Sequence, residues 1–276
     1  MTITSPADNG TITKPDVMVQ GTVTNASSLE TGVAVNGIVA MVYGNQFVAN
    51  HVPLQEGENT ITATATDTQG YTASESITVN VEASDDYIKI TAMPESGVSP
   101  LETRLSIDGT FSFTTYMRGV VGPGSVELLE SSPQGFLERI TGEGIYYFTV
   151  QVTDSENNDH TDTVAVVVLD QNQLDQLLKA KWSGMQKALI AGDITGALEY
   201  HYEGKKEKYE SIYNFLGANL PALAQQMQGI ELIYLEDNRA KYRINRDHDI
   251  DGQSVTITYY IYFIKDENGL WKIDKY

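Results

Sequence analysis

The chain has 276 residues, which is enough for two or three domains of ordinary size. It carries 18 Lys and Arg against 37 Asp and Glu, and the net charge of −19 makes nucleic acid and anionic membranes poor partners. It contains no cysteine, which excludes disulfides and thiolate metal sites, and no apolar run reaches the roughly 20 residues of a membrane helix.

Charge is distributed unevenly along the chain. Residues 1–170 contain 5 Lys and Arg against 22 Asp and Glu (−17), whereas residues 171–276 contain 13 against 15 (−2). We interpret the acidity of the first part as a source of solubility, with cation binding by clustered carboxylates as the alternative.

Part of the sequence is repeated 87 residues further on without a gap. The matched segments, in pairs, are residues 61–67 with 148–154, 76–81 with 163–168, and 3–4 with 90–91. Self-similarity at a fixed period is typical of tandem modules, so the first 170 or so residues are predicted to form two copies of one module.

The first module, residues 1–82, has the pattern of a β-sandwich. Strands are expected at residues 17–23, 33–35, 47–49, 52–54, 61–65 and 77–81, with a turn at 67–70. Asn36-Gly37 predicts a tight hairpin, since both residue types tolerate a positive φ. Ile61, Ala63 and Ala65 alternate with polar residues, which indicates one buried face. About seven short strands of this kind describe an Ig-like sandwich.

The same module carries a family resemblance over nearly its whole length. The residues that carry it are Val33-Ala34-Val35-Asn36-Gly37, Phe47, Leu54, Gly57, Asn59-Thr60-Ile61, Ala65-Thr66-Asp67 and Gly70. The module resembles the bacterial Ig-like domain typified by the B domain of glucodextranase. The resemblance implies an Ig-like sandwich in a secreted or surface protein, and it implies no activity.

The second module, residues 87–169, resembles the PKD (polycystic kidney disease) domain. The segments that carry this resemblance are residues 88–92, 94–101 and 147–154. The central Trp-Asp-Phe-Gly-Asp-Gly stretch of that family is missing, and divergent sequence around residues 120–144 takes its place. The resemblance implies a second sandwich, whose middle strands stay unassigned.

After residue 172 the apolar period changes from about 2 to about 3.6. One face of a long helix is marked by Leu174, Leu177, Leu178, Lys181/Trp182, Met185 and Leu189. Gly192 suits the residue after its end, and Asp193 suits the N-cap of the next helix. Further helices are expected near residues 197–200, 209–216 and from 219, then strands at 231–235, 239–245, 255–265 and 270–276. This order predicts an α+β domain over residues 172–276.

This last domain resembles the nuclear-transport-factor-2-like (SnoaL-like) fold. The residues that carry the resemblance are Trp182, Met185, Ala188-Leu189, Gly192-Asp193, Ala197-Leu198 and Asn268-Gly269-Leu270-Trp271-Lys272-Ile273. The fold implies a cone in which helices pack on a curved antiparallel sheet, often around a pocket. Its members include enzymes, binding proteins and inert partner modules. The residues expected to line a pocket are Trp182, His201, Tyr259, Tyr260 and Tyr262.

His201 is the one candidate for acid–base chemistry near such a pocket, and the simpler interpretation is a partly exposed histidine at a helix end. The stripe Val255, Ile257, Tyr259, Ile261 and Phe263 is interpreted as core. The sequence shows no His/Glu metal spacing, nucleophile elbow or phosphate loop, so we expect no enzymatic activity.

Two acidic clusters are candidate calcium sites. Asp247, Asp249 and Asp251 with Gly252 match the first half of a calcium loop, but Thr258 stands where the loop needs Glu, and a polar hairpin turn is the simpler interpretation. The second cluster follows from sandwich geometry, which places loop 154–159 close to linker 85–86. Its carboxylates are Asp85, Asp86, Asp154, Glu156 and Asp159. A solvated acidic hinge is the simpler interpretation there.

These observations predict a multidomain chain of two tandem all-β Ig-like sandwiches followed by an α+β cone. We expect a non-catalytic segment of a longer bacterial surface or secreted protein, acting outside the cell or at its surface. Its role would be structural display, adhesion or binding of protein or carbohydrate. The alternatives are a carbohydrate-binding accessory region of a larger secreted enzyme, and a small-molecule-binding or enzymatic pocket in the cone domain. We expect no cofactor apart from calcium at the acidic clusters, no nucleic-acid partner and no membrane insertion within this segment.

Overall fold

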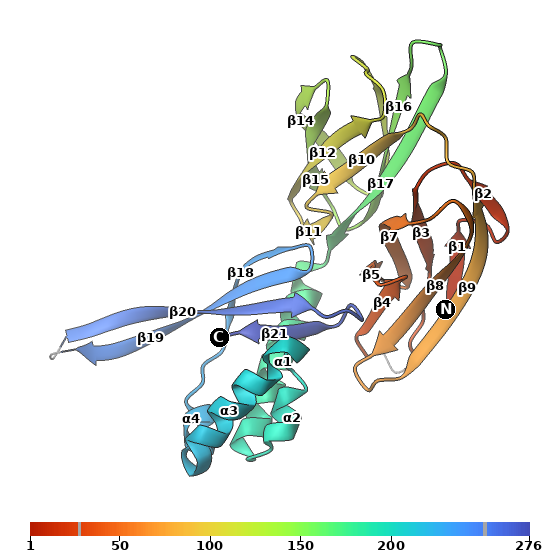
Figure 1. Ribbon diagram of the computed structural model, residues 1–276. Coiled ribbons are helices and arrows are strands. Elements are labelled where there is room, and N and C mark those ends of the chain that lie inside the picture. Colours follow the sequence, from red (N-terminus) through yellow and green to blue (C-terminus); the bar gives the residue numbers. More distant parts are fainter. Residues whose placement is uncertain (27–28, 251–252) are drawn as a thin grey trace. The chain divides into compact units, whose positions relative to one another are not determined.

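The computed structural model describes residues 1–26, 29–250 and 253–276, which form two compact units. The first unit comprises Met1–Asp170 with Glu267–Leu270, and the second comprises Gln171–Asp266 with Trp271–Tyr276 (Figure 1). The chain is therefore multidomain, with β-sandwich sheets first, then a helical segment and a final set of strands.

Two sheets build the first sandwich. One contains, in spatial order, β1 (Thr2–Ser5), β3 (Asp16–Thr22), β7 (Gln46–Pro53) and β6 (Met41–Tyr43). The other contains β2 (Gly10–Ile12), β9 (Thr72–Val81), β8 (Gly57–Asp67), β4 (Thr31–Val35) and β5 (Ile38–Val39). β1 pairs antiparallel with β3, whereas β2 pairs parallel with β9, so the first stretch of chain joins both sheets.

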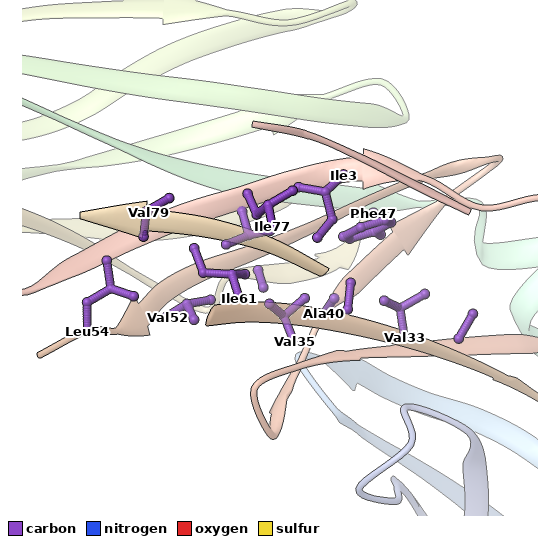
Figure 2. Packing of buried hydrophobic residues seen from close by; sticks show 14 of the residues in the cluster. Ile3, Val33, Val35, Ala40, Phe47, Val52, Leu54, Ile61, Ile77 and Val79 are labelled. Atoms are coloured by element: carbon purple, nitrogen blue, oxygen red, sulfur yellow. The ribbon is translucent and has the colours of Figure 1, made fainter. Parts of the chain in front are cut away.

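The core of this sandwich follows from the alternation in the sequence (Figure 2). Ile61, Ala63 and Ala65 of β8 are buried between the sheets, and the residues between them face outward. On the outer face, the hydroxyl groups of Thr62 and Ser76 lie 2.8 Å apart. Burial of an Ile or Val side chain is worth about 1.5–3 kcal/mol. The inner face therefore holds the sheets together, as predicted.

The predicted Asn36-Gly37 hairpin is confirmed, whereas the predicted interruption between residues 49 and 52 is absent. φ is 46° at Asn36 and 84° at Gly37, where β4 turns into β5. Residues 47–49 and 52–54 were predicted as separate strands, but they form the single strand β7. His51 has a φ of 52°, and the pairing with β3 shifts register there. A bulge bends the strand where the sequence suggested an interruption.

The second sandwich repeats the topology of the first. One sheet contains β10 (Ile88–Met93), β12 (Leu101–Gly109), β15 (Gly135–Thr141) and β14 (Ser125–Ser132). The other contains β13 (Met117–Val121), β16 (Gly144–Thr153), β17 (Asp159–Leu169) and β11 (Ser96–Val98). β11 runs parallel to β17 as β2 does to β9, and the repeated segments fall on β1 and β10, β8 and β16, and β9 and β17. Two copies of one module are thus confirmed. β13 and β14, in the stretch where the PKD pattern is missing, are edge strands and largely exposed.

Helices open the second unit. They are α1 (Gln171–Ile190), α2 (Ile194–Leu198), α3 (Lys206–Leu216) and α4 (Leu220–Gln225), with 3-10 turns at Glu203–Lys205 and Gly217–Asn219. Of the predicted face of α1, the buried residues are Leu174, Leu178, Trp182, Met185 and Leu189, whereas Leu177 and Lys181 are half-buried. Gly192 follows α1 with a φ of 75°, and Asp193 caps α2 by accepting a 2.8 Å hydrogen bond from the Gly196 N–H. None of the helices in the described part of the chain combines the length and apolar character that crossing a bilayer requires.

An antiparallel sheet closes the second unit. Its strands are β18 (Glu231–Glu236), β19 (Arg239–Ile250), β20 (Gln253–Lys265) and β21 (Trp271–Lys275), in chain order. Ile261 and Phe263 of the predicted core stripe are buried, but Val255 and Tyr259 are 40% and 45% exposed. The β19–β20 hairpin extends beyond the helices (Figure 1), and the exposure of these two side chains shows that the stripe prediction is wrong for its first part.

Candidate functional site

A groove of about 320 Å³ lies in the second unit. α1, α3 and α4 form one side, and β19 and β20 form the other. The aromatic residues of the lining are Trp182, Tyr209, Tyr213, Tyr259, Tyr260 and Tyr276. The aliphatic ones include Leu189, Ile212, Leu216, Leu220, Leu223, Ile244 and Ile261. Ligand pockets span roughly 300–1,000 Å³, so this groove is large enough for a small molecule with an apolar body.

Stacked rings form part of the lining. Tyr209 and Tyr276 are nearly parallel, with ring centroids 5.0 Å apart and an interplanar angle of 11°. Trp182 meets Tyr276 edge-on at 5.1 Å and donates its indole N–H to the Gln228 carbonyl at 2.9 Å. These contacts fix the rings in place, so the lining is preorganised.

His201 lies behind this lining and is fully buried. It lies three residues after the end of α2, and backbone pairing with β21 holds it there. The Tyr202 N–H donates to the Ile273 carbonyl at 2.9 Å, and the Ile273 N–H donates to the Tyr200 carbonyl at 2.8 Å. The prediction of a partly exposed histidine is wrong, because β21 and the tyrosines of α3 cover the ring.

The surroundings of His201 keep it neutral. Its Nε2 lies 2.8 Å from the Tyr213 hydroxyl, and its ring stacks on Tyr209 with centroids 4.3 Å apart. Burial lowers the pKa of His201 to about 4; the Ile273 carbonyl opposes this shift, and the charge of Lys206 adds to it. Its described hydrogen-bond partner is thus a phenol.

The phenol groups are engaged with one another. The Tyr213 hydroxyl contacts the Tyr276 hydroxyl and the Met185 sulfur, the latter at 3.7 Å. The Tyr276 N–H donates to the Tyr209 hydroxyl at 3.0 Å. Burial raises the pKa of Tyr213 and of Tyr276 well above the usual range. These groups therefore stay protonated at neutral pH and are suited to holding the lining in place.

The sequence found part of this site. The predicted pocket residues that do line the groove are Trp182, Tyr259 and Tyr260. His201 lies behind it, and the Tyr262 ring lies outside, 4.3 Å from the Lys275 ammonium group. The contributions of α3 and α4 were missed. Ile212, Leu216 and Leu220 recur at helical spacing, and this periodicity could have indicated them.

Arg246 of β19 is the charged residue among the described residues of the lining. Its Nη2 donates to the Gln226 carbonyl at 3.3 Å. Within the described part of the chain, no carboxylate forms an ion pair with its guanidinium. By contrast, Arg243 on the same strand is paired with Glu231 at 2.9 Å. The groove thus holds a positive charge without a carboxylate partner.

The predicted calcium loop is part of a β-hairpin. β19 continues to Ile250, so Asp247 and Asp249 are extended strand residues paired with β20. The Thr256 hydroxyl donates to Asp247 at 2.6 Å. Asp251 lies outside the described residues. Across the described ranges, no three His, Cys, Asp or Glu side chains come together in a way that could hold a metal ion.

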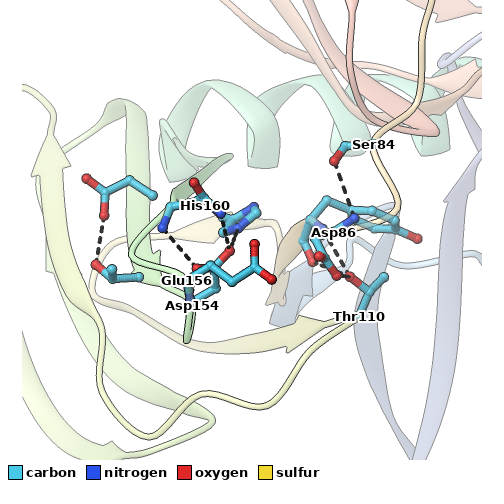
Figure 3. Close-up of polar contacts among 10 residues, drawn as sticks. Ser84, Asp86, Thr110, Asp154, Glu156 and His160 are labelled. Atoms are coloured by element: carbon cyan, nitrogen blue, oxygen red, sulfur yellow. Dashed lines mark hydrogen bonds and ion pairs between the residues drawn. The ribbon is translucent and has the colours of Figure 1, made fainter.

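The acidic residues predicted to meet at the joint between the sandwiches do not converge on one point (Figure 3). Asp154 closes the β16–β17 turn by accepting hydrogen bonds from the Glu156 and Asn158 N–H groups at 2.8 and 2.9 Å. His160 lies 2.8 Å from the same carboxylate. This contact is the largest cause that holds the pKa of Asp154 well below its usual range.

The first sandwich uses the same turn. Asp67, 87 residues earlier, accepts from the Gln69 and Tyr71 N–H groups at 2.9 and 3.0 Å. The repeated aspartate is therefore a turn-forming residue in both copies.

The remaining carboxylates of the predicted joint are occupied separately or exposed. Asp159 accepts a 2.7 Å hydrogen bond from Thr153, and Asp86 accepts one of 3.4 Å from Thr110. Asp85 and Glu156 are exposed. The structure shows no shared set of ligands here.

The two sandwiches meet through a buried interface. Its central apolar residues are Met41, Val48, Ile145, Ala165 and Val167. Asn50 donates to the Ala165 carbonyl at 2.8 Å and accepts from its N–H at 3.0 Å. Burial alone would raise the pKa of Asp16, yet His51 and Lys89 lower it to about 2, and the Lys89 ammonium lies 2.5 Å away. Apolar packing and paired polar groups thus join the two sandwiches, whereas the carboxylates of the predicted acidic hinge are exposed or bonded within their own turns.

One part of the chain matches a known family. The model of glucodextranase domain B matches residues 1–83. A search of curated proteins found none with significant similarity to the chain.

Solved structures give weak similarities to the chain. The fibronectin(III)-like modules of Clostridium thermocellum CbhA share 16% identity at a TM-score of 0.24, over 60% of this chain and 93% of that one. Protocadherin gamma B7 extracellular cadherin domains 1–4 share 12% sequence identity at a TM-score of 0.23, and the match covers 50% of this chain and 40% of that one. The third structure is SGBP-B of the Bacteroides ovatus mixed-linkage glucan utilization locus, solved in complex with a mixed-linkage heptasaccharide. It shares 16% sequence identity at a TM-score of 0.20, and the match covers 61% of this chain and 47% of that one. The chain thus spans less than half of the last two structures. Residues 1–83 form a module similar to domain B of glucodextranase, as the sequence predicted.

Proposed function

We propose that this chain is a non-catalytic binding segment of a secreted or surface bacterial protein. In this proposal the sandwich pair is the support, and the second unit carries the binding site. The observation behind the proposal is the groove lined by fixed aromatic rings. A concave, mostly apolar surface with few polar groups is the usual form of a small-molecule site.

Two observations support binding rather than catalysis. The Tyr213 hydroxyl, which lines the groove, bonds to the buried His201 on one side and to the Tyr276 hydroxyl on the other. The described lining holds neither an acidic side chain nor a cysteine. A hydrolytic or acyl-transfer site would need a nucleophile, a base and an oxyanion donor within reach of one point.

The sandwich pair supports the display part of the proposal. Its buried interface and the Asn50 hydrogen bonds make it a single body, which suits a support better than a flexible tether. The match to glucodextranase domain B favours an extracellular setting. Within this proposal the second sandwich is a PKD-like module, and the second unit is a nuclear-transport-factor-2-like cone.

Binding of N-phenylnaphthylamine, an uncharged aromatic dye, to the full chain tests the proposal. Ile212→Gln should weaken binding at least fivefold, because Ile212 lines the groove. Phe215→Gln is the matched control, since Phe215 is 88% exposed on the same helix and lies outside the lining. Equal binding by both variants and the unmodified chain would contradict the proposal.

A carbohydrate-binding accessory module is the second candidate, favoured by the name of the matched family. Stacking on sugars needs exposed aromatic rings. In the described part of the first unit, Tyr71, at 72%, is the large aromatic side chain with this exposure. Affinity electrophoresis of the full chain in soluble polysaccharides tests it. Retardation that Tyr71→Ala abolishes would favour this candidate over the groove.

A further inference from the structure

The groove combines an apolar body with one charge. Among its described residues, Arg246 alone is charged, and it has no carboxylate partner. Two residues before it on β19 lies Ile244, which pairs across the hairpin with Tyr259, and both of these residues line the groove. A guanidinium next to apolar rings is less well hydrated than one in open water, so an anion placed there gains more than it would at an exposed arginine.

Four of the five tyrosine hydroxyls in the described lining already have hydrogen-bond partners. The Tyr213 and Tyr276 hydroxyls bond to each other, and the Tyr209 hydroxyl accepts from the backbone of Tyr276. The Tyr259 hydroxyl lies 3.3 Å from His248 Nε2. A sugar needs many hydrogen-bond partners and would find the Gln226 amide and the Tyr260 hydroxyl beside mostly apolar surface, so it fits less well than an apolar body. A cation would find no carboxylate in the described lining and would meet Arg246.

We propose that the groove binds a monoanionic amphiphile, whose aromatic or aliphatic body lies against the tyrosine rings and whose acidic head pairs with Arg246. The inference rests on the proposed binding function and names its ligand class. A carboxylate, sulfonate or sulfate head can accept two hydrogen bonds from the guanidinium fork. The body fills the space between α3 and β20. Residues 1–170 carry a net charge of −17 and repel such anions, whereas residues 171–276, which contain the groove, carry only −2.

A pair of dyes tests this on the full chain. Anilinonaphthalene sulfonate and uncharged N-phenylnaphthylamine share one aromatic body and differ by the acidic group. The unmodified chain should bind the sulfonate more tightly. Arg246→Gln should weaken sulfonate binding about tenfold, as loss of a charged hydrogen bond does, and should change binding of the uncharged dye less than twofold.

Two variants separate the charge from its position. Arg246→Lys should restore part of the sulfonate affinity, and Arg239→Gln, which removes an exposed charge of the same strand outside the groove, should leave both dyes unaffected. Unaltered tryptophan fluorescence in Arg246→Gln would show that the second unit is still folded.

The outcomes separate the two proposals. If Ile212→Gln weakens both dyes while Arg246→Gln affects neither, the groove binds apolar ligands and the anion inference is wrong. If Ile212→Gln affects neither dye, the binding function itself is wrong. If dye binding falls as protein concentration rises and light scattering shows a dimer, a second copy occupies the groove, and the inference is also overturned.

Discussion

Replacing His201 by glutamine should make the second unit less sensitive to acid. The folded chain holds the pKa of His201 at about 4, against an ordinary value of 6.5. Between these two pH values, His201 is protonated in the unfolded chain and neutral in the folded chain. The free energy of unfolding therefore falls as the pH drops from about 6.5 to about 4, by about 3 kcal/mol for this shift. His201→Gln removes this contribution, and its amide can still accept a hydrogen bond from Tyr213.

The assay is urea denaturation of the full chain, followed by tryptophan fluorescence at pH 7, 5.5 and 4. Both tryptophans of the chain, Trp182 and Trp271, belong to the second unit, so the signal reports on that unit. The difference in free energy of unfolding between pH 7 and pH 4 should be about 3 kcal/mol smaller in His201→Gln than in the unmodified chain. His248→Gln, in the same unit, should behave like the unmodified chain. An equal acid loss in all three proteins would refute the assignment of this effect to His201.

Three further predictions concern the first unit, measured by urea denaturation and far-ultraviolet circular dichroism. Asn50→Ala leaves both backbone groups of Ala165 without their partner and should lower the free energy of unfolding by about 2–4 kcal/mol. Asp16→Asn should cost about 1–3 kcal/mol at pH 7. Because its folded pKa is depressed to about 2, this contribution is full above pH 3.8 and should vanish as the pH falls through 2. Gly21→Ala would place Cβ 2.2 Å from a carbonyl oxygen of β1 and should cost more than about 2 kcal/mol. Gly37→Ala meets nothing within 4 Å and should cost only about 1 kcal/mol, from its positive φ.

Each of these has a clear contrary result. An unchanged urea midpoint in Asn50→Ala would mean that water or a shifted backbone replaces the lost bonds. A cost of Asp16→Asn that is the same at pH 7 and pH 2 would mean that the carboxylate charge does not stabilise the joint. Equal costs for the two glycine variants would mean that the strands can move apart to admit a methyl group.

The sequence predicted the sandwich repeat because the alternation that buries Ile61 also buries Val150 in the second copy. It did not predict the role of Asp154. A carboxylate in an acidic loop looks the same whether it ligates a cation or accepts N–H groups of its own turn. The aligned pair Asp67 and Asp154 held a signal, since a residue repeated at the same turn is explained by the turn itself. The interface around Asn50 could not be predicted from the sequence either, because it joins strands that are distant in sequence.

The open groove itself follows from a mismatch of lengths that periodicity cannot express. β20 has 13 residues, and at about 3.3 Å per residue it extends about 43 Å. The helices on the other side of the groove are shorter: α1 has 20 residues, α3 has 11 and α4 has 6, which at about 1.5 Å per residue reach about 30, 16 and 9 Å. The sequence pattern of alternating apolar residues is the same whether or not a helix covers the strand. It therefore could not show that Val255 is exposed and Ile261 is buried. The lining includes Tyr259 and Tyr260, which are half exposed, and the buried Ile261 next to them. The groove thus lies where the helices cover the sheet only in part. There an apolar ligand gains the most binding free energy, because it removes exposed aromatic surface from water.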